Sequence, residues 1–378
     1  MRTPRARRWR ARTIVGLVSL SVAACTVRED AVQRSQLHRY RIVHVVEGLD
    51  YAWGMAFLPN GDMLVTERDG ALRIIRDGVL DTQHVSGVPA VRATGQGGLL
   101  DVAIHPNFAT NKLVYLSFSK PGPEGATTAV VRGRLEGHAL VDVQDVFEAK
   151  AWTRGAGHFG SRLAFDRNGY LFISVGERQI MRDAQRLDTH QGKIIRLHDD
   201  GRVPKDNPFV GRKDTLPEIY ALGIRNPQGL TIHPTTGEVW ESEHGPRGGD
   251  EINVIRAGRN YGWPVITHGI GYDGIPISEF KEMDGMETPL FAFVPSIGTS
   301  GIAIYHGDAF PEWRGDVFVG GLVGEELARV SFKGNEPKHE ALVRIGRRIR
   351  DVRVGADGFI YLLIDEANAP MLRLEPAR

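Results

Sequence analysis

The 378-residue sequence has a single cysteine, Cys25, almost no net charge and no long hydrophobic run. With one cysteine, no disulfide can form within the chain. A formal net charge of +1 lacks the basic excess typical of nucleic-acid binding, so we expect no nucleic-acid partner. Long helical periodicity is absent too, which disfavours an α-helical fold. The 45 glycines and 20 prolines instead indicate many short elements joined by tight turns.

The N-terminal residues form a segment of their own. Six arginines among the first 12 residues precede an apolar run over residues 14–24. This run is too short to span a membrane, which takes about 20 residues, and it fits a signal peptide over residues 1–24. The residues before Cys25 resemble a lipobox, which predicts a lipid anchor on that cysteine, a polar tether over residues 25–38 and a periplasmic location. An ordinary secretory signal with a chance cysteine is the alternative.

One pattern recurs six times from Tyr40 onward: a short apolar run, a tight turn rich in Pro, Asp and Gly, and a second apolar run. Each copy predicts two adjacent antiparallel strands. Six units of about 59 residues can each form a four-stranded sheet. We therefore predict an all-β fold, a single six-bladed β-propeller over residues 39–378, with a two-sheet sandwich as the alternative. The copies span residues 54–66, 100–118, 161–175, 229–240, 301–320 and 351–363.

Polar residues stand just before the first run of several copies, where propeller strands open toward the central channel. Blade symmetry would bring these positions together over the channel, beside long loops near residues 178–220 and 264–297. A histidine there suits a general base near neutral pH, and converging arginines suit a polyanionic ligand with carboxylates. Taken singly, each also has a structural explanation, as a core histidine or a salt-bridged arginine. These residues are Gln96, His158, Arg225, Asn226, Arg348 and Arg350.

The turn over residues 243–253, EHGPRGGDEIN, has a different chemistry. Gly245, Pro246 and two further glycines expose main-chain carbonyls, and Asp250 and Glu251 add carboxylates. Ca²⁺ selects hard oxygens of both kinds. The turn therefore predicts a Ca²⁺ site, although an ordinary glycine-rich turn before a charged strand has the same composition.

Six strings in order resemble one family. GQGGLLD, HFGSRL, GIRNPQGL, EHGPRGGDEIN, NYGWP and RIRDVR resemble the soluble aldose sugar dehydrogenases that use pyrroloquinoline quinone (PQQ), over about residues 40–375. The resemblance implies a six-bladed propeller with the quinone over the channel. It also implies oxidation of an aldose at its anomeric carbon to a lactone, with an external electron acceptor.

Matched position by position, the resemblance implies a role for each site residue. His158 is expected to take the proton of the anomeric hydroxyl, and Arg225 to stabilise charge on the quinone oxygen. The carbonyls of Gly245 and Pro246 are expected to hold the Ca²⁺ that polarises the quinone, and Glu251 and Tyr261 a structural Ca²⁺. The expected contacts to the quinone are Gln96, Arg225, Asn226, Tyr272, Arg348 and Arg350.

One position departs from the family pattern. Val323 stands where the family places a lysine, and two glutamates follow it. A charge-assisted contact contributes roughly 1.5–3 kcal/mol, so this change predicts quinone binding weaker by about one to two orders of magnitude. Two other functions stay open: a Ca²⁺-dependent hydrolase of lactonase type, and a propeller that only binds a partner.

Overall fold

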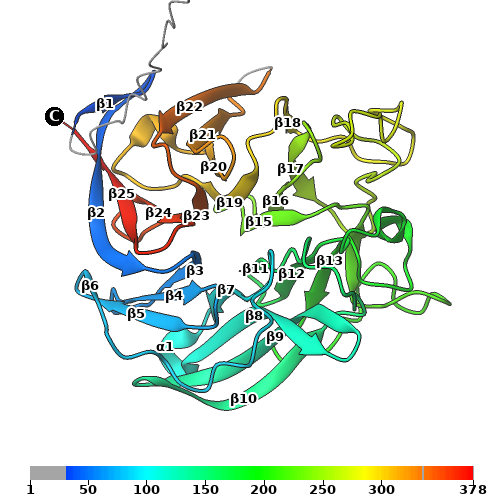
Figure 1. Ribbon diagram of the computed structural model, residues 1–378, viewed down its shortest axis with the longest axis horizontal. Coiled ribbons are helices and arrows are strands. Elements are labelled where there is room, and N and C mark those ends of the chain that lie inside the picture. The colour runs from blue at the N-terminus through cyan, green and yellow to red at the C-terminus, as the bar shows by residue number, and fades with distance from the viewer. Residues whose placement is uncertain (1–30, 334–335, 378) are drawn as a thin grey trace, which may run out of the picture.

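Six antiparallel sheets surround a central axis in the computed structural model, which describes residues 31–333 and 336–377 (Figure 1). The predicted signal peptide and Cys25 lie outside these residues. No helix in the described part of the chain is long and apolar enough to cross a membrane.

Five of the sheets each consist of four consecutive strands. Their bounds, blade by blade, are β3 (Ala52–Phe57), β4 (Met63–Glu67), β5 (Leu72–Arg76) and β6 (Val79–Leu80); β7 (Leu99–Ile104), β8 (Leu113–Gly122), β9 (Gly125–Glu136) and β10 (Ala139–Glu148); β11 (Leu163–Phe165), β12 (Leu171–Val175), β13 (Lys193–Leu197) and β14 (Ile219–Leu222); β15 (Pro227–Ile232), β16 (Val239–Glu243), β17 (Asp250–Ile255) and β18 (Phe291–Phe293); and β19 (Thr299–Ile304), β20 (Val317–Gly321), β21 (Glu326–Ser331) and β22 (Lys338–Arg344).

The sixth sheet combines both ends of the described chain. Strand β2 pairs antiparallel with β25, with Tyr40 opposite Pro376 and Leu49 opposite Ala369, so the blue and red strands lie side by side in Figure 1. This pairing closes the ring and links the two ends non-covalently. Strand β1, which falls within the segment predicted as a tether, pairs with the outer edge of β2. The strands of this sheet are β1 (Gln33–Arg34), β2 (Arg39–Leu49), β23 (Ile349–Val354), β24 (Ile360–Ile364) and β25 (Ala369–Pro376).

The innermost strands contact one another in a closed cycle: β3, β7, β11, β15, β19, β23 and again β3. Hydrophobic clusters fill each of the six interfaces between neighbouring blades in the described residues. The six-bladed propeller is therefore confirmed, and the sandwich alternative is wrong. Within residues 31–333 and 336–377, helical structure is limited to α1 (Phe108–Asn111) and two 3-10 turns, Met181–Gln185 and Pro311–Trp313.

Each predicted repeat is the inner strand pair of a blade, and its turn residues explain why the pair forms. In the third blade, Asp166 accepts hydrogen bonds from the main-chain N–H of Asn168 and of Tyr170, both at 2.9 Å. Gly169 supplies the positive φ of 81° that the turn requires. Such a turn closes a two-strand hairpin without help from distant residues.

Buried charges tie the blades together inside the channel. Arg162 of the third blade contacts Asp351 at 2.9 Å and Asp101 at 3.4 Å, and Arg353 contacts the same two carboxylates at 3.0 and 3.1 Å. Arg162, Asp101 and Asp351 are almost completely buried. Two positive and two negative groups thus compensate one another beneath the face that carries the loops.

Candidate active site

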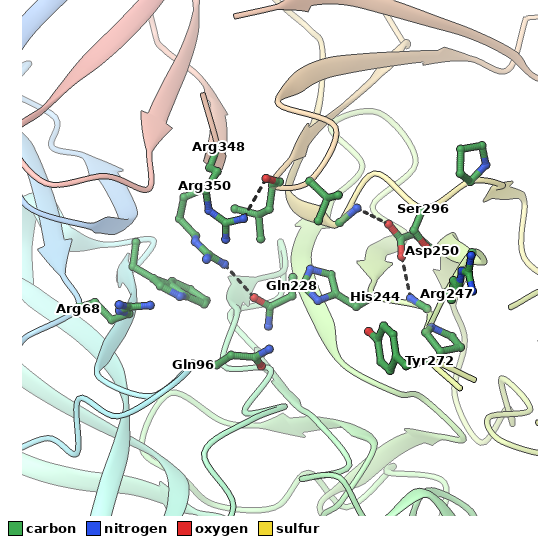
Figure 2. A pocket seen from close by; sticks show the side chains of 18 residues that line it. Arg68, Gln96, Gln228, His244, Arg247, Asp250, Tyr272, Ser296, Arg348 and Arg350 are labelled. Atoms are coloured by element: carbon green, nitrogen blue, oxygen red, sulfur yellow. Dashed lines mark hydrogen bonds between the residues drawn. The ribbon is translucent and has the colours of Figure 1, made fainter. Parts of the chain in front are cut away.

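A cavity of about 470 Å³ lies over the channel, and residues from several blades line it (Figure 2). A second cavity, of about 640 Å³, adjoins it. Pro246 and Tyr272 border both cavities. Both long loops noted in the sequence reach the second cavity, the first with Gln179 and Met181 and the second with residues 271–273 and 275–277. The predicted residues that line the first cavity are Gln96, Gly245, Pro246, Tyr272, Arg348 and Arg350.

Arg348 and Arg350 share one carboxylate. Asp365 Oδ2 lies 3.2 Å from Arg348 and 2.7 Å from Arg350. Although burial opposes ionisation, these two guanidinium groups lower the pKa of Asp365. Arg350 also donates to Gln228 Oε1 at 3.2 Å, and Arg348 to the Leu322 carbonyl at 3.0 Å. Two cations against one anion leave a net positive charge at the wall of the first cavity.

His158 borders the second cavity and is held there by two hydrogen bonds. Its Nδ1 is bonded to the buried carboxylate of Glu177, and its main-chain N–H donates to Gln96 Oε1 at 2.7 Å. Its φ of 53° is unusual for a residue with a side chain. Gly176 permits this conformation, because a Cβ there would lie 2.2 Å from the His158 carbonyl oxygen.

The charge state of His158 follows from its surroundings. Burial lowers its pKa from the usual 6.5, Arg225 and Arg178 lower it further, and Glu177 opposes them. The imidazole is therefore neutral at pH 7. Because Nδ1 faces the Glu177 carboxylate, the ring proton belongs on Nδ1, which leaves Nε2 as the basic nitrogen.

Arg225 lines the second cavity, whereas Asn226 is fully buried and lines neither cavity. The guanidinium group of Arg225 donates to the main-chain carbonyls of His244 (2.9 Å) and Gly245 (2.8 Å) and lies 5.2 Å from the Trp263 ring centre. Asn226 Oδ1 accepts from Gly160 N–H and the Gln228 amide, both at 3.2 Å. These contacts join the His158 loop to the turn after β16.

The turn after β16 differs from the expectation at one residue. Asp250, expected as a source of cation-binding oxygen, accepts four hydrogen bonds instead: from Gly245 N–H, Ser296 Oγ, Gly298 N–H and Thr299 N–H, at 2.6–3.1 Å. Its oxygens thus tie the turn to the fifth blade. The described residues contain no cluster of three or more His, Cys, Asp or Glu side chains arranged for a metal ion. A cation at this turn would have to rely on main-chain oxygens.

Glu251 and Tyr261 line a small cavity together with Glu243 and Arg225. Glu243 and Glu251 are opposite each other in the β16–β17 pairing, and the buried Glu241 lies on the same strand as Glu243. Burial, reinforced by the neighbouring carboxylates, raises the pKa of Glu241 and Glu251 well above the usual value and that of Glu243 to about 7. Glu243 and Glu251 thus bring two carboxyl groups to this cavity, while the Tyr261 hydroxyl donates to the Val254 carbonyl at 2.6 Å and accepts from Arg256 N–H at 2.8 Å.

Comparison with known proteins identifies the family. The glucose/sorbosone dehydrogenase family matches residues 49–373. The chain belongs to this family. It is thus a sugar dehydrogenase, and its family agrees with the fold and with the resemblance seen in the sequence.

Three relatives of this sugar dehydrogenase are informative. It is 44% identical over 336 residues to the aldose sugar dehydrogenase YliI of Escherichia coli, covering 87% of this chain and 91% of that protein. The apo-form crystal structure of the soluble aldose sugar dehydrogenase of Escherichia coli superimposes with a TM-score of 0.86 at 42% identity, covering 89% of this chain and all of that one. The PQQ-bound aldose sugar dehydrogenase of Streptomyces coelicolor gives 0.74 at 27% identity, covering 89% and 98%.

Several residues of the dehydrogenase site were not found from the sequence. They share one position: each follows the second strand of a blade. Of the residues predicted from the sequence, Gly245 and Pro246 also follow a second strand, whereas the predicted histidine, glutamine and asparagine and two of the arginines precede a first strand. In an antiparallel pair, the end of the second strand lies beside the start of the first. The missed residues were therefore detectable by the same rule applied at the other end of each repeat. They are Arg68 after β4, Glu177 after β12, His244 after β16 and Asp365 after β24.

Val323 occupies the corresponding position after β20. Its side chain lines the first cavity and the residue is 71% exposed, while its N–H donates to the Ile297 carbonyl at 2.8 Å. The wall of the cavity is apolar there, since Leu322 lines it as well.

Proposed function

We propose that this sugar dehydrogenase oxidises an aldose at its anomeric carbon to the lactone, with PQQ as cofactor, Ca²⁺ as its partner ion and His158 as general base. The observation that carries the proposal is the meeting of two cavities at Pro246 and Tyr272. One is walled by arginines that suit a polyanion, and the other contains a neutral histidine paired with a carboxylate.

The residues of the first cavity fit a flat tricarboxylate. Arg348 and Arg350 carry more charge than Asp365 compensates, and the buried Nε atom of Arg350 has no hydrogen-bond partner among the described residues. Gln96 and Tyr272 would add uncharged contacts, and the buried Asn226 would act through Gln228, whose amide it holds at the cavity wall. Bound there, the quinone would supply the acceptor for the anomeric hydride.

The residues of the second cavity would handle the proton. Nε2 of His158 would accept the proton of the anomeric hydroxyl, and the Glu177 carboxylate would stabilise the imidazolium that forms. Arg225 would stabilise negative charge that develops where the two cavities meet. Trp263 holds the Arg225 guanidinium through its ring face, which limits the orientations of this cation.

Ca²⁺ would bind hard oxygens in two places. Gly245 and Pro246 line the first cavity, and their carbonyls would hold the ion beside the quinone, with the Gly245 carbonyl shared with the Arg225 guanidinium. Glu251 and Tyr261, with the neighbouring Glu243, would hold a structural ion in the small cavity. A hydrolase of lactonase type would instead need side-chain carboxylates around an open water position. Asp250, the acid that lines the first cavity, has its oxygens engaged.

Reconstitution tests the function. Chelator-treated protein should reduce a dye with aldoses only when both Ca²⁺ and PQQ are added, and His158→Ala should abolish this activity without loss of quinone binding. Absence of quinone binding would leave a propeller that only binds another ligand, and lactone hydrolysis without quinone would favour the hydrolase.

We also propose that the protein is periplasmic and anchored through lipid on Cys25, with residues 1–24 removed; the tether would be the part of residues 25–38 that precedes β1, since β1 pairs with the sixth blade. The anchor would keep the enzyme near the membrane, where an external electron acceptor can reoxidise the cofactor. Cys25→Ser should move the protein from the membrane fraction to the soluble periplasmic fraction. Retention in the membrane fraction would argue against the anchor.

A further inference from the structure

Arg68 lines the first cavity, where the quinone is proposed to bind, on the side opposite Asp250, as Figure 2 shows. It follows β4 directly, and its main chain is fixed by hydrogen bonds to two neighbouring segments. Its N–H donates to the Tyr51 carbonyl at 3.3 Å, and its own carbonyl accepts from Leu99 N–H at 3.1 Å.

A glycine of the GQGGLLD string makes room for this arginine. Gly98 has a φ of 145°, and a Cβ on it would lie 1.9 Å from the Arg68 carbonyl oxygen and 2.6 Å from Arg68 Cγ. Any other residue at position 98 would push Arg68 away from its place. The string therefore shapes the cavity wall twice, through Gln96 directly and through Gly98 by admitting Arg68.

The charge of Arg68 is not used within the protein. Its guanidinium carbon lies 5.3 Å from the Tyr51 ring centre, yet no acidic group of residues 31–333 or 336–377 lies within ion-pair distance. The adjacent Glu67 is engaged elsewhere, with Arg73 at 3.0 Å and Asp50 N–H at 2.9 Å. Arg348 and Arg350, in contrast, share Asp365.

We propose that Arg68 is a cofactor-binding residue that anchors a carboxylate of the quinone. The inference rests on the proposed quinone function and deepens it. With Val323 in place of the lysine expected from the family pattern, the cavity lacks one ammonium group. Arg68 provides a cation in the same cavity, and its charge is free to meet an anion. Binding of the tricarboxylate in this chain therefore depends on Arg68.

The test is direct binding of PQQ to the full-length protein with Ca²⁺ and no sugar, followed by quenching of tryptophan fluorescence. Arg68→Gln should weaken PQQ binding about tenfold. This is the low end of the range for a charge-assisted contact, because Arg68 is partly exposed and water screens its charge. Arg68→Lys should stay within about threefold of wild type, since it keeps the charge. The matched control, Arg182→Gln, changes an exposed arginine outside both cavities and should leave affinity within about twofold.

The trimethyl ester of PQQ separates charge from shape. The ester lacks the carboxylate charges, so Arg68→Gln should not change its affinity. Equal loss of affinity for the ester and the free acid would overturn the proposal, because it would indicate a steric role for Arg68. Unchanged PQQ affinity in Arg68→Gln would overturn the proposal for Arg68 and leave the proposed function standing. Failure of wild-type protein to bind PQQ would overturn it together with the proposed function.

Discussion

Replacing Glu177 with glutamine tests the proposed proton transfer most directly. Glu177 is about 1% exposed and its carboxylate is bonded to Nδ1 of His158. The substitution keeps the size of the side chain and the possibility of a hydrogen bond, but removes the negative charge. A hydrogen bond to a charged group contributes about 1.5–3 kcal/mol and a neutral one about 0.5–1.5 kcal/mol.

The difference of about 1–2 kcal/mol acts on the imidazolium that forms when His158 accepts a proton. We therefore expect kcat to fall about 5- to 30-fold at saturating PQQ and Ca²⁺. The pH profile adds a second readout. A base must be neutral, and burial and Arg225 hold the pKa of His158 below 6.5, so wild-type activity should fall only as pH drops below that value. Glu177 raises the pKa of His158, so its replacement lowers that pKa further. The loss of activity at acid pH should then begin at a lower pH than in the wild type.

The assay is dye reduction by an aldose between pH 5 and 8, together with the Kd for PQQ, which should not change. Glu47→Gln is a matched control, because Glu47 is bonded to Nδ1 of His44 in an exposed pair far from both cavities. Wild-type kcat and an unchanged pH profile in Glu177→Gln would refute the assignment of His158 and Glu177 as the proton-accepting pair.

Three further substitutions probe the channel, the loops and the first cavity. Arg162→Leu leaves Asp101 and Asp351 buried with less compensation, so the free energy of unfolding should fall by about 3–5 kcal/mol in urea titrations; a loss below about 1 kcal/mol would contradict the role given to this cluster. Lys193→Met removes an ammonium group that binds three main-chain carbonyls, so the free energy of unfolding should fall by about 1–3 kcal/mol in the same titrations. An unchanged unfolding midpoint would contradict this. Val323→Lys should tighten PQQ binding about tenfold or more by calorimetry, and unchanged affinity would show that position 323 lies out of reach of the cofactor.

The inner strand pairs were predictable because each is specified within about 20 consecutive residues. Apolar alternation and a turn such as Asp166–Gly169 determine a hairpin locally, and all six predicted pairs are present. Polar residues before the first strand were equally accessible, since blade symmetry places equivalent positions at one end of the channel. The partners at the end of the second strand, Glu177 and Asp365 among them, were overlooked although the same geometry applies to them.

The sequence by itself determined that this protein is built from six β-units and that histidine and arginine gather at one face, because strands, turns and repeats depend on neighbouring residues. Only the tertiary structure decided which charges are already compensated. Three of the four donors to Asp250 lie more than 40 residues away in the chain, and Arg348 and Arg350 share Asp365, whereas Arg68 has no acidic partner among the described residues. The reason is physical: an ion pair requires two groups within about 4 Å, and the closure of the ring by β2 and β25 sets the distances between residues that are far apart in the chain.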